Sequence, residues 1–180
     1  MEFDVAAFLA EAAPPSKAPT IASPGIYAIL LANPDALPAL TAGRGGILYL
    51  GMTNDGLDAR NHFHHAHSGF STFRRSLGAL LKGGLGLHPI PRAPGKSRSN
   101  VVNYRFPDEE ERALSQWMQA NLQIAQLALK GDIATTEKDA IRLLEPPLNL
   151  TGWPNPQRAM LKGLRADCVT QAELARGPSK

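Results

Sequence analysis

The sequence predicts a mixed α/β fold in a single domain, and three observations support this prediction. Two apolar runs of strand length, Gly25–Leu31 and Gly46–Leu50, are rich in Ile, Leu and Tyr and are separated by turn-forming residues. Several later segments begin with a capping residue and end at Gly or Pro, as helices do. The chain has 180 residues, of which 43% are hydrophobic and 19% charged, and this is ordinary for one globular domain.

The two apolar runs are expected to form an antiparallel pair at the start of the domain proper, which spans residues 21–150. Side chains alternate between the two faces of a strand, and pairing of the runs could bring Tyr27 close to Tyr49. Residues 1–20 contain several prolines and show no sustained periodicity beyond a possible short helix at Phe3–Ala10. They are expected to form a flexible N-terminal arm.

Two helices are expected after this pair of strands. The turn-forming Asn54–Gly56 precedes a helix from Leu57 to His67. Ser71 can cap a second helix, Thr72–Lys82, which the adjacent Gly83-Gly84 pair would end.

The last part of the chain is expected to contain an extended segment, two helices and a C-terminal extension. Val101–Phe106 is expected to be extended, and a helix should follow from Pro107 to about Ala120. A second helix, capped by Thr135 or Thr136, should end after Leu144 at Pro146-Pro147. The extension over residues 151–180 is expected to hold a short helix after Pro156 and then a polar tail. Between the two helices, Leu122–Leu129 suits either a continued helix or a strand.

The basic residues are concentrated in one segment. The chain has 19 Lys and Arg against 16 Asp and Glu, a net charge of +3, yet no acidic residue lies between Arg60 and Phe106. Within this segment the Gly- and Pro-rich Gly83–Asn100 is expected to be a long loop, and residues 69–100 a basic insertion. Surfaces of Lys and Arg bind phosphate backbones, and a solvated loop without acids is the alternative. The candidate nucleic-acid contacts are Arg74, Arg75, Lys82, Arg92, Lys96 and Arg98.

The sequence shows no sign of export or of membrane insertion. Its one cysteine, Cys168, cannot form an intrachain disulfide and suits a reducing compartment. The acidic start and the lack of an apolar run of about 18 residues argue against a signal peptide and a membrane span. We therefore expect a cytoplasmic protein without a membrane partner.

Five short signals follow one another in a fixed order along the chain. They are Gly25-Ile26-Tyr27, Tyr49-Leu50-Gly51, Arg60 with His64 four residues later, Glu137, and Pro146-Pro147-Leu148-Asn149. In this order they resemble the GIY-YIG nuclease superfamily, over roughly residues 25–149. The resemblance implies a small three-stranded antiparallel sheet flanked by helices, with Leu122–Leu129 as its third strand. It also implies an endonuclease, and with it nucleic acid becomes the favoured partner of the basic segment.

The chain departs from the family pattern at three places. Leu50 replaces the Ile of the second signature, Met52 stands where many members have a polar or basic residue, and Tyr27 and Tyr49 are farther apart than usual. None of these changes removes a presumed catalytic group.

The resemblance assigns roles to particular residues. Glu137 lies nine residues before Pro146 and twelve before Asn149, the spacing of the metal-ligating Glu in the family, so it is the expected ligand of Mg²⁺ or Mn²⁺. Tyr27 and Tyr49 would line the active site and hydrogen-bond the attacking water and the phosphate. The expected catalytic residues are Tyr27, Tyr49, Arg60, His64, Glu137 and Asn149.

Glu137 is expected on the inward-facing side of its helix. On a helix it shares a stripe with Ala140, Ile141 and Leu144, the side that is expected to pack inward. A carboxylate there needs a cation, a metal or several hydrogen bonds, because burying an unpaired charge is costly. The alternative is an ordinary first-turn acid that favours the helix dipole.

Arg60 and His64 lie four residues apart and would share one helix face. Arg presents a rigid fork of donors to a phosphate, and neutral His accepts a proton near physiological pH. Tyr27 is the other candidate for the general base, and His64 ranks ahead of it because an unperturbed tyrosine has a pKa of about 10. Asn149 would orient either a ligand or the backbone.

Other interpretations remain open from the sequence. The cluster of His62, His64, His65 and His67 suggests zinc, but no Cys or nearby carboxylate completes a tetrahedral site. The chain could be a non-catalytic nucleic-acid-binding module, or a domain that binds an acidic protein. DNA is favoured over RNA as the substrate, and the sequence does not define the oligomeric state.

Overall fold

The centre of the fold is a three-stranded antiparallel sheet with the strand order β2-β1-β3. The computed structural model describes residues 3–58, 63 and 67–176. The strands are β1 (Gly25–Leu31), β2 (Ile47–Thr53) and β3 (Leu122–Ala128). The expected third strand is therefore confirmed, and β1 has the predicted bounds.

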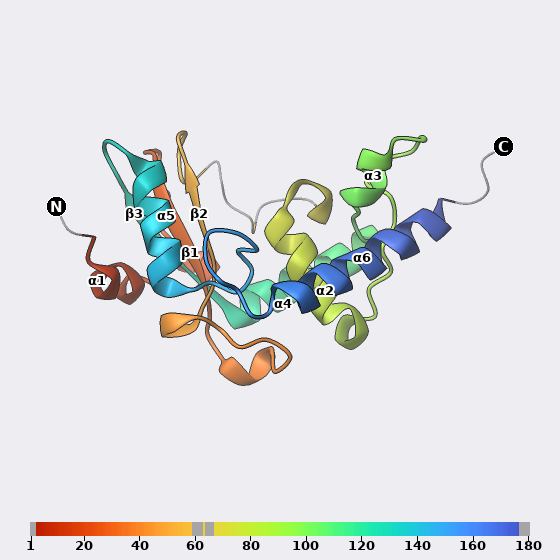
Figure 1. The fold of residues 1–180 in the computed structure, drawn as a ribbon, viewed down its shortest axis with the longest axis horizontal. Helices are drawn as coiled ribbons and strands as arrows, with labels where there is room; N and C mark the ends of the chain where they lie inside the picture. The colour runs from red at the N-terminus through yellow and green to blue at the C-terminus, as the bar shows by residue number, and fades with distance from the viewer. Residues whose placement is uncertain (1–2, 59–62, 64–66, 177–180) are drawn as a thin grey trace. The chain divides into compact units, whose positions relative to one another are not determined.

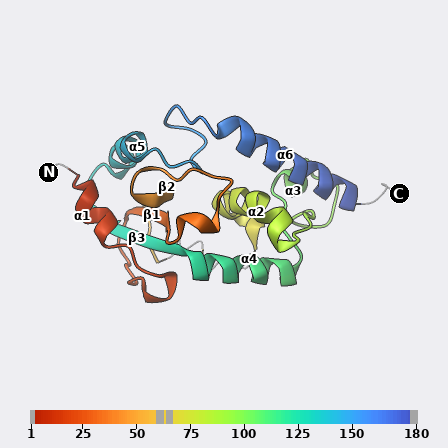
Figure 2. The same cartoon turned by 90° about the horizontal axis from the view of Figure 1, so that it is seen from below.

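The helices belong to two compact units of the chain. Their bounds are α1 (Val5–Ala10), α2 (Thr72–Leu85), α3 (Arg98–Val102), α4 (Asp108–Asn121), α5 (Ile133–Leu144) and α6 (Arg158–Ala175). The first unit holds the sheet with α1 and α5, which lie beside the strands in Figure 1. The second unit holds α2, α3, α6 and most of α4, with α2 between α4 and α6 (Figure 2). None of the described helices is long and apolar enough to cross a membrane.

The register of the sheet separates its two faces. In β2, Gly51 lies opposite Tyr27 and Tyr49 lies opposite Ile29 of β1. Since neighbouring residues of a strand point to opposite faces, both tyrosines lie on one face. Ile26, Ala28 and Leu30 of β1 point to the other face.

Helix α5 packs on the face that carries Ile26, Ala28 and Leu30. Buried side chains from the sheet, from α5 and from α1 form this core; they are Phe8, Ile26, Ala28, Leu30, Ile47, Leu50, Ala125, Ile133, Ala140, Ile141 and Leu144. The predicted inward stripe of α5 is therefore confirmed, because Ala140, Ile141 and Leu144 are all members.

The segment expected to be a flexible arm contains α1. Asp4 caps this helix by accepting a hydrogen bond from the Ala7 N–H at 3.0 Å. Phe8 is only 3% exposed, and its burial holds the helix against the sheet. After the helix, Ala13 and Ile124 exchange two backbone hydrogen bonds of 3.0 and 2.9 Å along the outer edge of β3.

The second unit contains α2, whose start is as predicted and whose end is not. The Ser71 hydroxyl accepts a hydrogen bond from the Arg74 N–H at 3.1 Å, as expected of an N-cap. The predicted stop at the Gly83-Gly84 pair is wrong, because the helix continues to Leu85. It ends at Gly86, which has a φ of 63° and donates its N–H to the Lys82 carbonyl.

Two further sequence predictions are wrong in this unit. Val101 and Val102 are not extended but form the last two residues of α3. Asn103, which follows the helix, donates a 3.0 Å hydrogen bond from its side-chain amide to the Ser99 carbonyl. The helix expected after Pro156 is present as α6, but it is not short: it has 18 residues and extends through the expected polar tail. Its fully buried side chains recur at helical spacing along one stripe: Leu161, Cys168 and Ala172.

Helices α4 and α5 lie close to their predicted positions. As predicted, α4 begins directly after Pro107, and α5 ends at Leu144 before the two prolines. The predicted cap of α5 is wrong: Asp132 is the N-cap, and its carboxylate accepts hydrogen bonds from the N–H and the hydroxyl of Thr135 at 3.0 and 2.7 Å. Most of the helix predicted from Leu57 to His67 lies outside the described residues.

Candidate active site

Tyr27 and Tyr49 lie side by side on the face of the sheet opposite α5. Their ring centroids are 6.2 Å apart, which confirms that strand pairing brings them together. Tyr27 is 2% exposed, and its ring lies over Gly51. A Cβ atom at Gly51 would lie 2.5 Å from the Tyr27 hydroxyl oxygen and 2.6 Å from its Cζ. The glycine of the second signature therefore leaves room for the tyrosine of the first.

Asn149 is bonded to the outer edge of β2. Its Oδ1 accepts a hydrogen bond from the Leu50 N–H at 2.9 Å, and its Nδ2 donates to the Leu50 carbonyl at 2.8 Å. The neighbouring Leu148 N–H donates to the Leu48 carbonyl at 2.9 Å. Of the two roles expected for Asn149, these contacts correspond to orienting the backbone.

Two residues that the sequence reasoning missed hold the loop that carries Asn149. The indole N–H of Trp153 donates to the carbonyls of Pro146 and Asn149 at 3.0 and 3.2 Å. The side-chain amide of Asn155 donates to the carbonyls of Pro147 and Asn149 at 2.7 and 3.2 Å. Their only signal in the sequence is an aromatic and an amide residue shortly after the Pro-Pro element.

Glu137 lies in the second turn of α5 and is half-buried. Because Asp132 is the N-cap, Glu137 is not a first-turn acid, and the helix-dipole alternative loses its basis. The residue continues the stripe of Ala140, Ile141 and Leu144 toward the start of the helix. Its helix packs against β2.

Strand β2 is thus the element common to four of the expected catalytic residues. Tyr49 lies in it, Tyr27 crosses it at Gly51, and Asn149 is bonded to it at Leu50. Helix α5, which carries Glu137, packs against it from the face opposite the two tyrosines. The other two, Arg60 and His64, lie outside the described residues.

A comparison with protein-family models gives one match. The GIY-YIG catalytic domain matches residues 25–167, which is most of the chain. The chain belongs to the GIY-YIG family. No curated protein and no solved structure shows a significant match to it. The family indicates a nuclease domain with a nucleic-acid substrate, and GIY-YIG nucleases generally use divalent metals.

Two of the six cations expected to bind nucleic acid are inside this GIY-YIG protein. Arg74 is fully buried, and its guanidinium is 2.8 Å from the Glu111 carboxylate and 2.9 Å from the Ser115 hydroxyl. Arg75 is 6% exposed and donates to the carbonyls of Ser68 and Gly69, each at 3.1 Å. Burial lowers the pKa of Arg75 to about 10. Neither guanidinium is placed to meet a phosphate backbone, and we remove both from the candidate interface.

The other four cations are accessible. Lys82 and Arg92 are half-buried, while Lys96 and Arg98 are exposed. Lys96 and Arg98 line a pocket of about 320 Å³ together with side chains of α6 and with Arg176 just after it. Arg176 is ion-paired with Glu173 at 3.1 Å and was missed in the sequence because this region reads as a polar tail.

The zinc alternative depends on four histidines. His62, His64 and His65 lie outside the described residues, and His67 is half-buried. Across residues 3–58, 63 and 67–176, no three His, Cys, Asp or Glu side chains gather in a way that could hold a metal ion.

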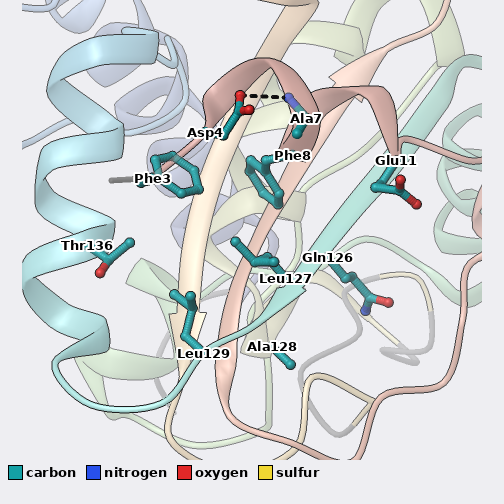
Figure 3. A pocket seen from close by; sticks show the side chains of 10 residues that line it. All are labelled: Phe3, Asp4, Ala7, Phe8, Glu11, Gln126, Leu127, Ala128, Leu129 and Thr136. Atoms are coloured by element: carbon teal, nitrogen blue, oxygen red, sulfur yellow. Dashed lines mark hydrogen bonds between the residues drawn. The ribbon is translucent and has the colours of Figure 1, made fainter. Parts of the chain in front are cut away.

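A second pocket of the GIY-YIG protein lies apart from the residues above. It has a volume of about 410 Å³ and is bounded by α1, β3 and the start of α5. Figure 3 shows the rings of Phe3 and Phe8 and the side chains of Leu127 and Leu129 around it. None of the described residues that line it belongs to the expected catalytic set.

Proposed function

We propose that this protein is a divalent-metal-dependent endonuclease that hydrolyses phosphodiester bonds, and that its substrate is DNA rather than RNA. The observation that carries the proposal is the meeting of Tyr27, Tyr49 and Asn149 at β2, the strand against which α5, the helix of Glu137, packs from the other face of the sheet. The family match supports nuclease chemistry. The dependence of this protein on a divalent metal and the choice of DNA as its substrate are our additions.

Glu137 suits a single hard cation. Carboxylate oxygen is the donor that Mg²⁺ prefers, and Mg²⁺ commonly keeps several waters and takes its other ligands from substrate phosphates. A half-buried carboxylate in the second turn of α5, where the helix already has Asp132 as its cap, fits this use. When bound, the ion would supply Lewis-acid stabilisation of charge on the phosphate. We propose Glu137 as its direct protein ligand.

The remaining residues would position the reactants and carry protons. The hydroxyls of Tyr27 and Tyr49 would hydrogen-bond the attacking water and the scissile phosphate. His64 would accept the proton of that water, with the Tyr27 hydroxyl as the second candidate for this role. Arg60 would offset the negative charge that develops on the phosphoryl oxygens, a contribution worth roughly 10²–10³-fold in comparable sites.

Asn149 acts in this proposal as a positioning residue. Its amide is already bonded to the backbone of Leu50, between Tyr49 and Gly51 in the sequence. By holding the outer edge of β2, it would fix the strand from which Tyr49 projects and over which Tyr27 lies.

The nucleic-acid backbone would be bound by the accessible cations of the basic segment. They are Lys82, Arg92, Lys96 and Arg98, to which the pocket formed with α6 adds Arg176. Such contacts give affinity that falls with rising salt and carries no sequence readout.

Conversion of supercoiled plasmid to nicked and linear DNA tests the proposal. The wild-type protein should convert the plasmid in Mg²⁺ or Mn²⁺ and should be inactive in chelator. If the protein binds plasmid, branched DNA, single-stranded DNA and RNA yet cuts none of them in either metal, it is a non-catalytic binding module and the proposal fails.

A further inference from the structure

One aromatic side chain in the second unit is exposed, although it contacts two neighbouring side chains. Phe70 ends the 3₁₀ turn η4 (Ser68–Phe70) and is 67% exposed. Phe8, Phe73 and Phe106 are each at most 3% exposed. A single exposed phenyl ring is ordinary on a protein surface, so what distinguishes Phe70 is the set of contacts around it.

Two neighbouring side chains support the Phe70 ring. The guanidinium carbon of Arg92 lies 5.2 Å from the ring centroid, within the range of a cation–π contact. The imidazole of His67 lies 4.9 Å from the same centroid and is tilted by 36° to it. Arg92 is itself tied to Asn100, its backbone N–H donating to the Asn100 carbonyl at 2.8 Å. Most of the Phe70 ring stays open to solvent despite both contacts.

The backbone before Phe70 is fixed by buried charges. The Glu111 carboxylate accepts hydrogen bonds from the Ser68 N–H and hydroxyl at 2.7 and 3.0 Å. Arg74 neutralises that carboxylate, and Arg75 donates to the carbonyls of Ser68 and Gly69. The two arginines removed from the candidate interface thus anchor the turn that presents Phe70.

Gly69 keeps the ring and Arg92 together. A Cβ atom at this position would lie 2.6 Å from Cγ and 2.9 Å from Cδ of Arg92, and it would push that side chain off the ring. The turn therefore combines a fixed backbone, an exposed aromatic ring and an adjacent guanidinium.

We propose that Phe70, supported by Arg92 and His67, is a stacking platform for an unpaired nucleobase of the bound nucleic acid. Every base has a π-face, and aromatic rings and guanidinium planes are the surfaces on which unstacked bases are held. Arg92 also places a positive charge beside the ring, where the adjoining phosphate would lie. The inference rests on the proposed function in taking nucleic acid as the ligand, and it defines the substrate class as one with unpaired bases.

Binding measurements with the full chain test the platform. Fluorescence anisotropy in chelator would follow a single-stranded oligonucleotide of about 16 nucleotides and a blunt duplex of the same length. Phe70→Leu should weaken single-strand binding by about tenfold and leave duplex binding within about twofold, while Phe70→Tyr should retain wild-type affinity. Leu174→Ala is the matched control, because Leu174 is 77% exposed and lies outside the turn. A 5-iodouracil base in the single strand should crosslink to Phe70 in the wild type.

Two results would overturn the platform: single-strand affinity of Phe70→Leu equal to that of the wild type, or an equal loss on the duplex. Plasmid cutting by the same preparations separates this from the proposed function. If the wild type cuts DNA while Phe70→Leu binds single strands normally, the stacking platform is rejected and the proposed nuclease function is retained. A wild type that crosslinks through Phe70 but cuts nothing keeps the platform and rejects the nuclease.

Discussion

The side-chain amide of Asn149 is paired with both backbone groups of Leu50, at 2.9 and 2.8 Å, although the two residues are 99 positions apart in the sequence. The amide therefore occupies the place of a neighbouring strand on the outer edge of β2. Edge strands leave a row of backbone groups unpaired, and here the loop after α5 satisfies part of that row. The contact ties the last signature of the chain to the second one.

Loss of this pairing should destabilise the protein. Asn149→Ala removes both hydrogen bonds and leaves the Leu50 backbone groups unpaired, so the free energy of unfolding should fall by about 1–3 kcal/mol. Urea denaturation of the purified chain measures this. Asn54→Ala, in the exposed turn after β2, is the control and should change stability by less than about 0.5 kcal/mol. Equal effects of the two substitutions would contradict the positioning role.

Gly51 and Tyr27 should be energetically coupled. A Cβ at Gly51 overlaps the Tyr27 ring, so Gly51→Ala should lower the free energy of unfolding by about 1–3 kcal/mol in the wild type. In a Tyr27→Leu background the shorter side chain does not cross Gly51, and most of that cost should disappear. A double-mutant cycle from denaturant unfolding measures the coupling. The same cost in both backgrounds would show that the ring and the glycine do not compete for space.

The buried pair of Arg74 and Glu111 should be far more sensitive than the surface pair next to it. Glu111→Gln leaves the fully buried Arg74 guanidinium uncompensated, with an expected loss of about 3–5 kcal/mol. Glu110→Gln removes the partner of His88, which is 79% exposed, and should change stability by about 1 kcal/mol or less. Thermal or urea unfolding compares the two. Similar losses in both variants would contradict the buried arrangement.

Stability should decrease in mild acid because of His67. Burial lowers the pKa of His67 below its ordinary value of 6.5, an effect that Glu111 partly opposes. The unfolded chain therefore takes up this proton at a higher pH than the folded chain does, and the free energy of unfolding falls as the pH drops below about 6.5. His67→Gln should lose less stability than the wild type between pH 7.5 and pH 5, as urea unfolding would show. An equal loss in both proteins would assign the effect to other groups.

Local pattern was sufficient for two of the three strands and for the starts of several helices, whereas β3 was expected as a strand only because of the family resemblance. Apolar runs rich in Ile and Leu predicted β1 and β2, and Ser71 and Pro107 marked helix starts that the structure retains. The end of α2 was missed because glycine only weakens a helix, so Gly83 and Gly84 stay helical until Gly86 closes the last turn in a left-handed conformation.

The remaining errors involve partners that are distant in the sequence. Arg74 was predicted to contact nucleic acid, yet its side chain is buried and pairs with Glu111, 37 positions away in the sequence. No local feature distinguishes an arginine in a basic segment from one in a buried ion pair. A helix was predicted after Pro156, but its full length was missed: Leu161, Cys168 and Ala172 follow helical spacing, and the charged residues between them obscured the stripe.

The candidate site was predictable in part. Strand pairing and the alternation of side chains were enough to expect Tyr27 beside Tyr49. The position of Glu137 in the second turn of α5 follows from where the helix begins. Asp132 could be recognised as the N-cap only from its contacts with Thr135 in the structure. The bond from Asn149 to Leu50 has no counterpart in any local pattern.

The central claim is tested most directly by the rate of the first strand cut in supercoiled plasmid by Glu137→Gln in saturating Mg²⁺. Asp139→Asn is the matched control, because Asp139 is an exposed carboxylate on the same helix that faces Arg142. We predict that Glu137→Gln cuts at least about 100-fold more slowly than the wild type while binding the plasmid equally well, and that Asp139→Asn cuts within about twofold of it. Metal-dependent cutting by Glu137→Gln at the wild-type rate would contradict the assignment of Glu137 as the metal ligand.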